Sequence, residues 1–240
     1  MSRFIIIKAG ATFPNISRKY GDFEDWTRQG LGVPPEQVLV FDAIHDHCLP
    51  CAKEFDGVVV TGSHSMVTDG HDWSERLIKW IAKLVDSGVP FLGICYGHQL
   101  LTRAAGGTVG YHPQGQEIGT VDIELLPESS TDQLFQGLPS QFPVHTTHSQ
   151  TVLSLPSNAI RLAANAFEKC HAIRIGECAW GVQFHPEYDT HIMNSYIEEQ
   201  AGKLESAGRN LTEIYGTVRE TPQAATILRK FAEICKHGDQ

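Results

Sequence analysis

The sequence predicts an α/β protein built on a mostly parallel, doubly wound sheet flanked by helices, with a small antiparallel portion. Short continuous apolar segments, helix-like segments between them and alternating segments in the second half support this fold class. The 240 residues suffice for one large domain, and no low-complexity linker divides them. We therefore expect a single domain over residues 1–240, ending in a C-terminal helical extension from about 205 to 240.

Four short segments of branched apolar residues predict the parallel strands. They are "FIIIKA" (4–9), "VLVFDA" (38–43), "GVVVTG" (57–62) and "PFLGIC" (90–95). Each is apolar throughout rather than at every second position, which is typical of strands covered on both faces. We therefore expect all four strands to be buried.

The segments between and after these strands favour helices and more exposed strands. In "DWSERLIKWIAKLVDSG" apolar residues recur at helical spacing, and Gly88 is placed to end the helix. Residues 119–126, 171–177 and 179–185 alternate instead, as antiparallel strands do. The chain turns helical again after residue 187, and a closing amphipathic helix begins near Thr221-Pro222.

Composition argues against several classes of partner. The formal net charge is −9 and no basic stripe occurs, so we expect no nucleic acid partner. No apolar segment approaches the length of a membrane span, and "FIII" is too short for a signal peptide. We expect a cytoplasmic protein without a membrane partner. The pair Cys48 and Cys51 follows His45 and His47, but no second pair completes a zinc site, so we expect a plain loop, no metal and no cofactor.

A cysteine lies where a strand turns into a helix. The order Gly93-Ile94-Cys95-Tyr96-Gly97 after a strand predicts a nucleophile elbow, a tight turn that pushes a reactive side chain out above the sheet. The N-terminus of the following helix favours a thiolate, and its amides can stabilise an oxyanion. The alternative is a buried structural cysteine between packing glycines.

The predicted base lies in "WGVQFHPEYD" (180–189). His185 ends an alternating strand, which Pro186 stops. Glu187 lies two residues on, so its carboxylate can fix the imidazole tautomer and stabilise the charged ring. On its own this motif is more typical of a surface turn. With the elbow it predicts a nucleophile Cys95, a base His185 and an orienting Glu187.

"GICYGHQLL" and "GVQFHPE" resemble the two signature motifs of triad-type class I glutamine amidotransferases. The resemblance spans about residues 40–200 and implies that family's flavodoxin-like fold, as in the glutaminase domain of GMP synthetase. It also implies that Cys95 attacks the glutamine side-chain amide to form a glutamyl thioester. His185 would then act as general base and acid and Glu187 as its orienter, releasing ammonia and glutamate.

Two further segments match the family. "VVVTGSHS" (58–65) resembles its oxyanion strand, although Ser63 replaces the second of two glycines. We expect a backbone N–H of Gly62 or Ser63 to pair with that of Tyr96 as the oxyanion hole. The resemblance also places four residues near the bound substrate, with Gln150 where the GMP-synthetase branch usually has an acidic residue. These are Gln99, His148, Ser149 and Gln150.

The sequence leaves three functions open. The first, which the family resemblance favours, is glutamine amidotransferase or glutaminase activity, with any synthetase on a separate polypeptide because no nucleotide-binding motif occurs here. The second is hydrolysis of a γ-glutamyl peptide or γ-glutamyl amine by the same triad. The third is a non-catalytic binding or regulatory module, which would have no need of the complete Cys/His/Glu set. In the first two functions the expected partner is a small-molecule substrate.

Overall fold

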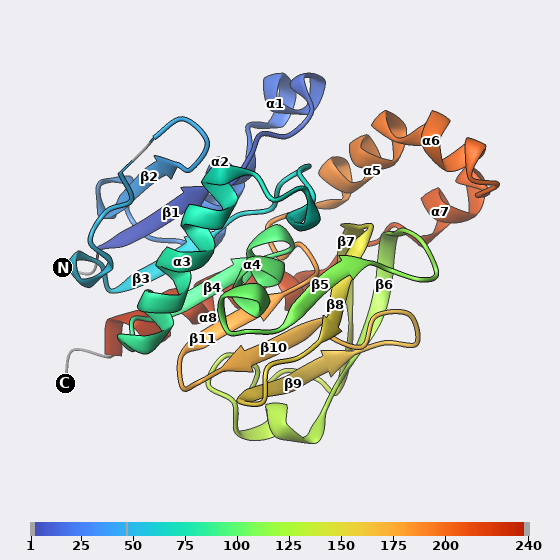
Figure 1. Ribbon diagram of the computed structural model, residues 1–240. Helices are drawn as coiled ribbons and strands as arrows, with labels where there is room; N and C mark the ends of the chain where they lie inside the picture. The colour runs from blue at the N-terminus through green and yellow to red at the C-terminus, as the bar shows by residue number, and fades with distance from the viewer. Residues whose placement is uncertain (1–2, 47, 238–240) are drawn as a thin grey trace.

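A computed structural model describes residues 3–46 and 48–237 of the chain (Figure 1). Its main sheet has nine strands in the order β2-β1-β3-β4-β11-β10-β9-β6-β7, and β5 and β8 pair separately. The strands are β1 (Phe4–Lys8), β2 (Val38–Asp42), β3 (Gly57–Val60), β4 (Phe91–Ile94), β5 (Thr108–Tyr111), β6 (Glu117–Leu125), β7 (Gln141–His148), β8 (Gln150–Ser154), β9 (Ala159–Ala164), β10 (Ala172–Ile175) and β11 (Ala179–Val182). The α-helices are α1 (Pro14–Tyr20), α2 (Phe23–Leu31), α3 (Asp72–Asp86), α4 (Tyr96–Ala104), α5 (Thr190–Glu199), α6 (Ala201–Ser206), α7 (Leu211–Thr217) and α8 (Pro222–His237).

Strands β2, β1, β3, β4 and β11 run parallel and form the predicted doubly wound half. Successive side chains of β1 point to opposite faces of the sheet. Phe4 and Ile6 pack in the cluster that contains residues of α2 and α8, whereas Ile5 and Ile7 pack in the cluster that contains residues of α3 and α4. Helices therefore cover both faces, and the predicted fold class is confirmed.

The expectation of burial is wrong for β2. Leu39 and Val40 are 49% and 38% exposed, although their segment is as apolar as the other three. β2 is the edge strand beside β1, so it has a hydrogen-bonded neighbour on one side alone. Continuous apolarity therefore identified the strand but not its place in the sheet.

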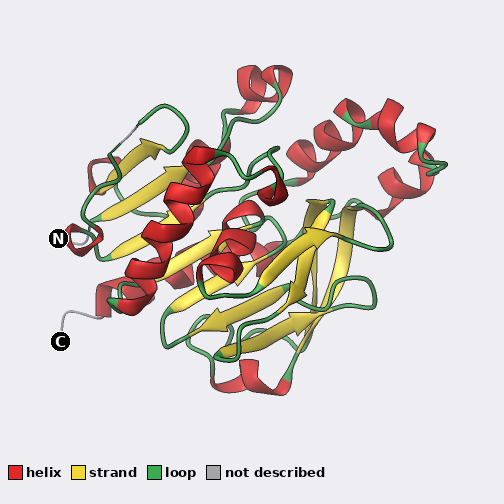
Figure 2. Cartoon of the chain, viewed as in Figure 1, coloured by secondary structure: helices red, strands yellow, loops and turns green. Residues whose placement is uncertain are grey.

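The other half of the sheet is antiparallel, from β11 through β10, β9 and β6 to β7 (Figure 2). This antiparallel half curls back toward the parallel half. Strand β7 is the outermost strand in the sheet order, but the carbonyl of its Thr147 lies 3.9 Å from Sγ of Cys95, which follows β4. Helices α5 to α7 follow β11 in the chain, and α8 begins at Pro222 as predicted. Within the described ranges no helix has both the length and the apolarity to cross a membrane.

Candidate active site

Cys95 occupies the turn between β4 and α4 with a strained backbone. Its φ of 48° makes it the one residue other than glycine with a positive φ among those described. Two glycines make room for the turn: a Cβ on Gly93 would lie 2.4 Å from the Gly97 backbone, and one on Gly97 would lie 2.5 Å from the Val60 carbonyl. Such strain costs about 1–3 kcal/mol and persists where the surrounding structure enforces it. The turn has the geometry predicted for a nucleophile elbow.

His185 and Glu187 form a buried pair. Nδ1 of His185 lies 2.7 Å from Oε1 of Glu187. Strand β11 ends at Val182, so His185 lies in the following loop rather than at the strand end. Its N–H donates to the carbonyl of His145 on β7 at 2.8 Å, which fixes the loop. Burial lowers the pKa of His185, but the charges of Glu187 and Cys95 outweigh that effect and raise it to about 10.

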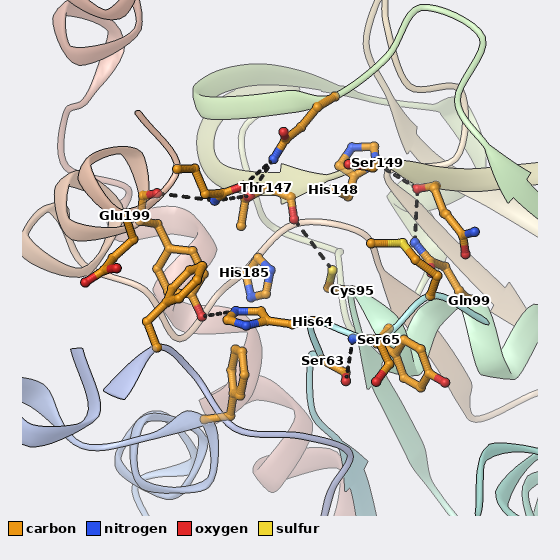
Figure 3. A pocket seen from close by; sticks show the side chains of 18 of the residues that line it. Ser63, His64, Ser65, Cys95, Gln99, Thr147, His148, Ser149, His185 and Glu199 are labelled. Atoms are coloured by element: carbon orange, nitrogen blue, oxygen red, sulfur yellow. Dashed lines mark hydrogen bonds between the residues drawn. The ribbon is translucent and has the colours of Figure 1, made fainter. Parts of the chain in front are cut away.

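Neighbouring strands bring the two motifs together across ninety positions of sequence. β4 and β11 pair in parallel, with Ile94 opposite Val182. The Cys95 N–H continues this pairing by donating to the Val182 carbonyl at 2.8 Å. Cys95 and His185 both line a cavity of about 330 Å³ (Figure 3). The ring Nε2 of His185 has no hydrogen-bond partner among the described residues and is left for a reacting group.

The predicted oxyanion donors lie beside the same cavity. Ser63 and Tyr96 both line it. Gly62 packs directly against His185, since a Cβ at position 62 would lie 3.0 Å from Cε1 of that ring. This contact gives a packing reason for glycine at position 62.

The four predicted substrate-binding residues also line the cavity, but three of them are held by protein groups. Nε2 of Gln99 donates to the Gln150 carbonyl and to Oε1 of Gln183, at 3.0 and 3.1 Å. The imidazole of His148 bonds the Gln150 carbonyl and Glu117. The Gln150 side chain accepts from the Val67 N–H and donates to the Thr68 hydroxyl, which ties that loop to β8. Ser149 is the member with no side-chain hydrogen bond among the described residues.

Sequence reasoning missed a chain of side-chain amides that ends on the sulfur. Gln183 is fully buried, and its Nε2 donates to Cys95 Sγ at 3.5 Å. Its Oε1 accepts from Gln99, so Gln99 fixes which end of the amide faces the sulfur. The signal was present, because Gln183 lies inside "GVQFHPE" two residues before His185.

The cavity wall next to His185 was missed as well. Rings of Phe13, Tyr188 and Tyr196 line it together with His64, and Tyr188 stacks on His185 with ring centroids 4.1 Å apart. Glu199 and Lys203 complete this wall from α5 and α6. These residues lie far apart in sequence and no motif links them, so the folded chain alone identifies the wall.

The loop that contains Cys48 and Cys51 joins β2 to β3, and both thiols are exposed. His47 lies outside the described residues. Across residues 3–46 and 48–237, no group of three or more His, Cys, Asp or Glu side chains could hold a metal ion.

Comparison with curated proteins finds relatives over most of the chain. Gamma-glutamyl peptidase 4 of Arabidopsis thaliana is 30% identical over 92% of this chain and 88% of its own length. The gamma-glutamyl-L-1-hydroxyisopropylamide hydrolase of a Pseudomonas species is 31% identical over 74% of this chain and 60% of its own. A glutamine-hydrolyzing GMP synthase subunit of Pyrococcus abyssi is 36% identical over 55% of this chain and 65% of its own.

Solved structures share the fold. A glutamine amidotransferase from Thermotoga maritima superposes with a TM-score of 0.77 at 21% identity, covering 99% of both chains. The family model of class I glutamine amidotransferases matches residues 31–202, which include the elbow, the His185–Glu187 pair and the segment from Thr147 to Gln150. The chain is an enzyme of the class I glutamine amidotransferase family.

Proposed function

We propose that the protein hydrolyses the γ-amide bond of γ-glutamyl compounds through Cys95, His185 and Glu187. The thiolate of Cys95 attacks the γ-carbonyl carbon, and the carbonyl oxygen becomes an oxyanion bound by backbone N–H groups of Tyr96 and of Gly62 or Ser63. His185 passes its proton to the nitrogen as the C–N bond breaks, so a neutral amine leaves. Water, deprotonated by His185, then cleaves the thioester and releases glutamate.

The observation that carries this proposal is the strained cysteine facing a buried imidazole–carboxylate pair across one cavity. A structural cysteine requires neither the positive φ at Cys95 nor the open Nε2 of His185. Glu187 holds the ring by Nδ1, which leaves Nε2 for the proton transfers. Each oxyanion donor contributes about 3 kcal/mol to lowering such a barrier.

The substrate class follows from the room beside the sulfur. A cavity of about 330 Å³ exceeds what a glutamine side chain needs, and its wall on the His185 side is aromatic. This observation favours γ-glutamyl peptides or γ-glutamyl amines, with glutamine the smallest member of the class. The names of the plant and Pseudomonas relatives agree with it.

A second candidate is supply of ammonia to a separate synthetase. The similarity to the Pyrococcus abyssi GMP synthase favours it, since that relative is named as a subunit. Under this function glutamine is the preferred substrate and a synthetase polypeptide is the partner.

Glutamate release tests the proposal and separates the two candidates. Purified protein is incubated with glutamine, γ-glutamyl dipeptides and γ-glutamyl amines, and free glutamate is measured. We expect kcat/KM for the best dipeptide or amine to exceed that for glutamine by at least tenfold. Glutamine as the best substrate would favour supply of ammonia to a synthetase, and no release from any of them would contradict the proposed hydrolysis.

Gln183 is proposed as a positioning residue for the nucleophile. Its N–H donor lies 3.5 Å from the sulfur and stabilises a thiolate more than a thiol. Gln183→Met keeps the length and removes the donor, so we expect the rate of iodoacetamide alkylation of Cys95 at neutral pH to fall by about fivefold.

The matched control is Gln116→Met, which removes a cavity amide that bonds Thr147 and Gln200 rather than the sulfur. We expect its alkylation rate to equal that of the wild type. An unchanged alkylation rate in Gln183→Met would show that this amide only fills space.

A further inference from the structure

The reaction divides the cavity into two sides. The leaving nitrogen must reach His185 to take its proton, so the amine part of a substrate lies on the His185 side of Cys95. In Figure 3, His185 and Glu199 lie on one side of the sulfur, and Gln99 and Ser149 lie on the other. The wall of α5 and α6 therefore faces the leaving group, and the β8 side faces the glutamyl group.

Three rings form a preassembled surface on the leaving-group side. The ring of His64 lies 4.4 Å from that of Phe13 and 5.8 Å from that of Tyr196, centroid to centroid. The Tyr196 hydroxyl bonds Nε2 of His64 at 3.2 Å and the Thr12 hydroxyl at 2.7 Å. Phe13 is half-buried and His64 is exposed, so the surface reaches the cavity mouth. Ammonia has no use for such a surface, whereas an apolar side chain gains from burial against it.

A single cation accompanies these rings. Lys203 is the one lysine or arginine among the described residues that line the cavity, and it makes no ion pair within the described part of the chain. Lys203 lies in α6, one helical turn or more after Glu199 and Tyr196 at the end of α5. Glu199 is engaged, because its Oε1 accepts from Nδ2 of Asn15 at 2.9 Å. Lys203 is thus available to a carboxylate that enters beside the rings.

We propose that Phe13, His64, Tyr196 and Lys203 form a subsite for a leaving amino acid with an apolar side chain and a free carboxylate. This inference rests on the proposed function and narrows it to γ-glutamyl dipeptides. The side chain packs on the rings, the carboxylate pairs with Lys203, and the α-nitrogen lies at His185. The thiolate forms a bond to the γ-carbonyl carbon, the bond between that carbon and this nitrogen breaks as His185 gives the nitrogen its proton, and the free amino acid departs. Water then restores the thiol and releases glutamate.

The test compares γ-glutamylphenylalanine with γ-glutamylphenethylamine, which lacks only the carboxylate of the leaving group. We expect the wild type to prefer the dipeptide in kcat/KM by at least fivefold. Lys203→Met should reduce this ratio by about fivefold, which is the size of a partly exposed charge-assisted contact. The control Lys79→Met removes the same charge from the exposed side of α3 and should leave the ratio unchanged.

The surface of rings is tested by a second ratio. Phe13→Ala should reduce the preference for γ-glutamylphenylalanine over γ-glutamylglycine by about tenfold, mainly through KM, because a ring contact is lost with the larger side chain. Equal losses on all substrates would instead indicate general damage to the site and would overturn the subsite.

A binding measurement separates failure of the subsite from failure of the proposed function. Free phenylalanine should slow iodoacetamide alkylation of Cys95 in the wild type, and Lys203→Met should weaken this protection. This readout requires no hydrolysis. Absence of hydrolysis together with protection would reject the proposed function alone. Hydrolysis without protection, and with equal rates on the dipeptide and the amine, would reject the subsite alone.

Discussion

Replacement of Cys95 by alanine or serine is expected to lower hydrolysis of γ-glutamyl substrates by at least about four orders of magnitude. Alanine removes the sulfur that forms the thioester, and a serine hydroxyl is a far weaker nucleophile than a thiolate at neutral pH. Both side chains are no larger than cysteine, so the turn between β4 and α4 has room for them. Circular dichroism and a thermal melt should show a folded protein.

Cys51→Ser is the control, because this thiol lies exposed in the β2–β3 loop, outside the residues that line the cavity. We expect wild-type turnover from it. Mass spectrometry after treatment with a γ-glutamyl electrophile should find the adduct on Cys95. Turnover by Cys95→Ala near the wild-type rate would rule out covalent catalysis at this position.

Loss of His185 is expected to cost nearly as much as loss of the nucleophile. His185→Ala removes the proton carrier for both steps and the cation that stabilises the thiolate, so we expect a decrease of about 10⁴-fold or more in kcat/KM. Glu187→Gln keeps the ring in place and removes one charge. The kcat/KM of Glu187→Gln should therefore remain about tenfold or more above that of His185→Ala.

The pH profile gives a second readout for Glu187. Glu187 raises the pKa of His185, which stands at about 10, and in the proposed mechanism the protonated ring is needed to release the amine. Activity should therefore decline on the alkaline side as His185 loses its proton. In Glu187→Gln the pKa of His185 falls, so the alkaline decline should move to lower pH.

The same pair contributes to stability with a defined sign. Because the folded-state pKa of His185 is raised from 6.5, its contribution is complete below about pH 6.5 and disappears as pH rises through about 10. Glu205→Gln removes an exposed carboxylate from α6 and is the control for charge. Identical alkaline limbs of the pH–activity profile in Glu187→Gln and the wild type would contradict the assigned role of Glu187.

Much of the parallel half of the fold could be predicted from sequence. Apolar segments and glycines identified β1, β3, β4 and the turn at Cys95, because a buried strand and a crowded turn each restrict residue type locally. Strand β7 escaped notice since "QFPVHTTH" contains Pro143 and several polar residues. Proline is tolerated there because β7 is the last strand of its sheet.

The predicted catalytic residues and the cavity walls differ in how sequence encodes them. Cys95 and His185 each lie in a short motif, so the sequence predicts their chemical roles without showing that they lie close together. Phe13 and Tyr196 meet with ring centroids 5.5 Å apart although 183 positions separate them. Their contact depends on how α5 packs beside the loop before α1, which no local pattern encodes.

The pairing of β4 with β11 has a consequence for how relatives of this protein diverge. The proposed nucleophile Cys95 and base His185 follow one pair of adjacent strands, while β7, β8 and the α5–α6 segment build the surrounding walls. Substitutions or insertions in those wall segments can change which leaving group the cavity accepts and leave the residues that cleave the bond unchanged. A lineage with this architecture can acquire new substrates by remodelling peripheral segments around an inherited reaction centre.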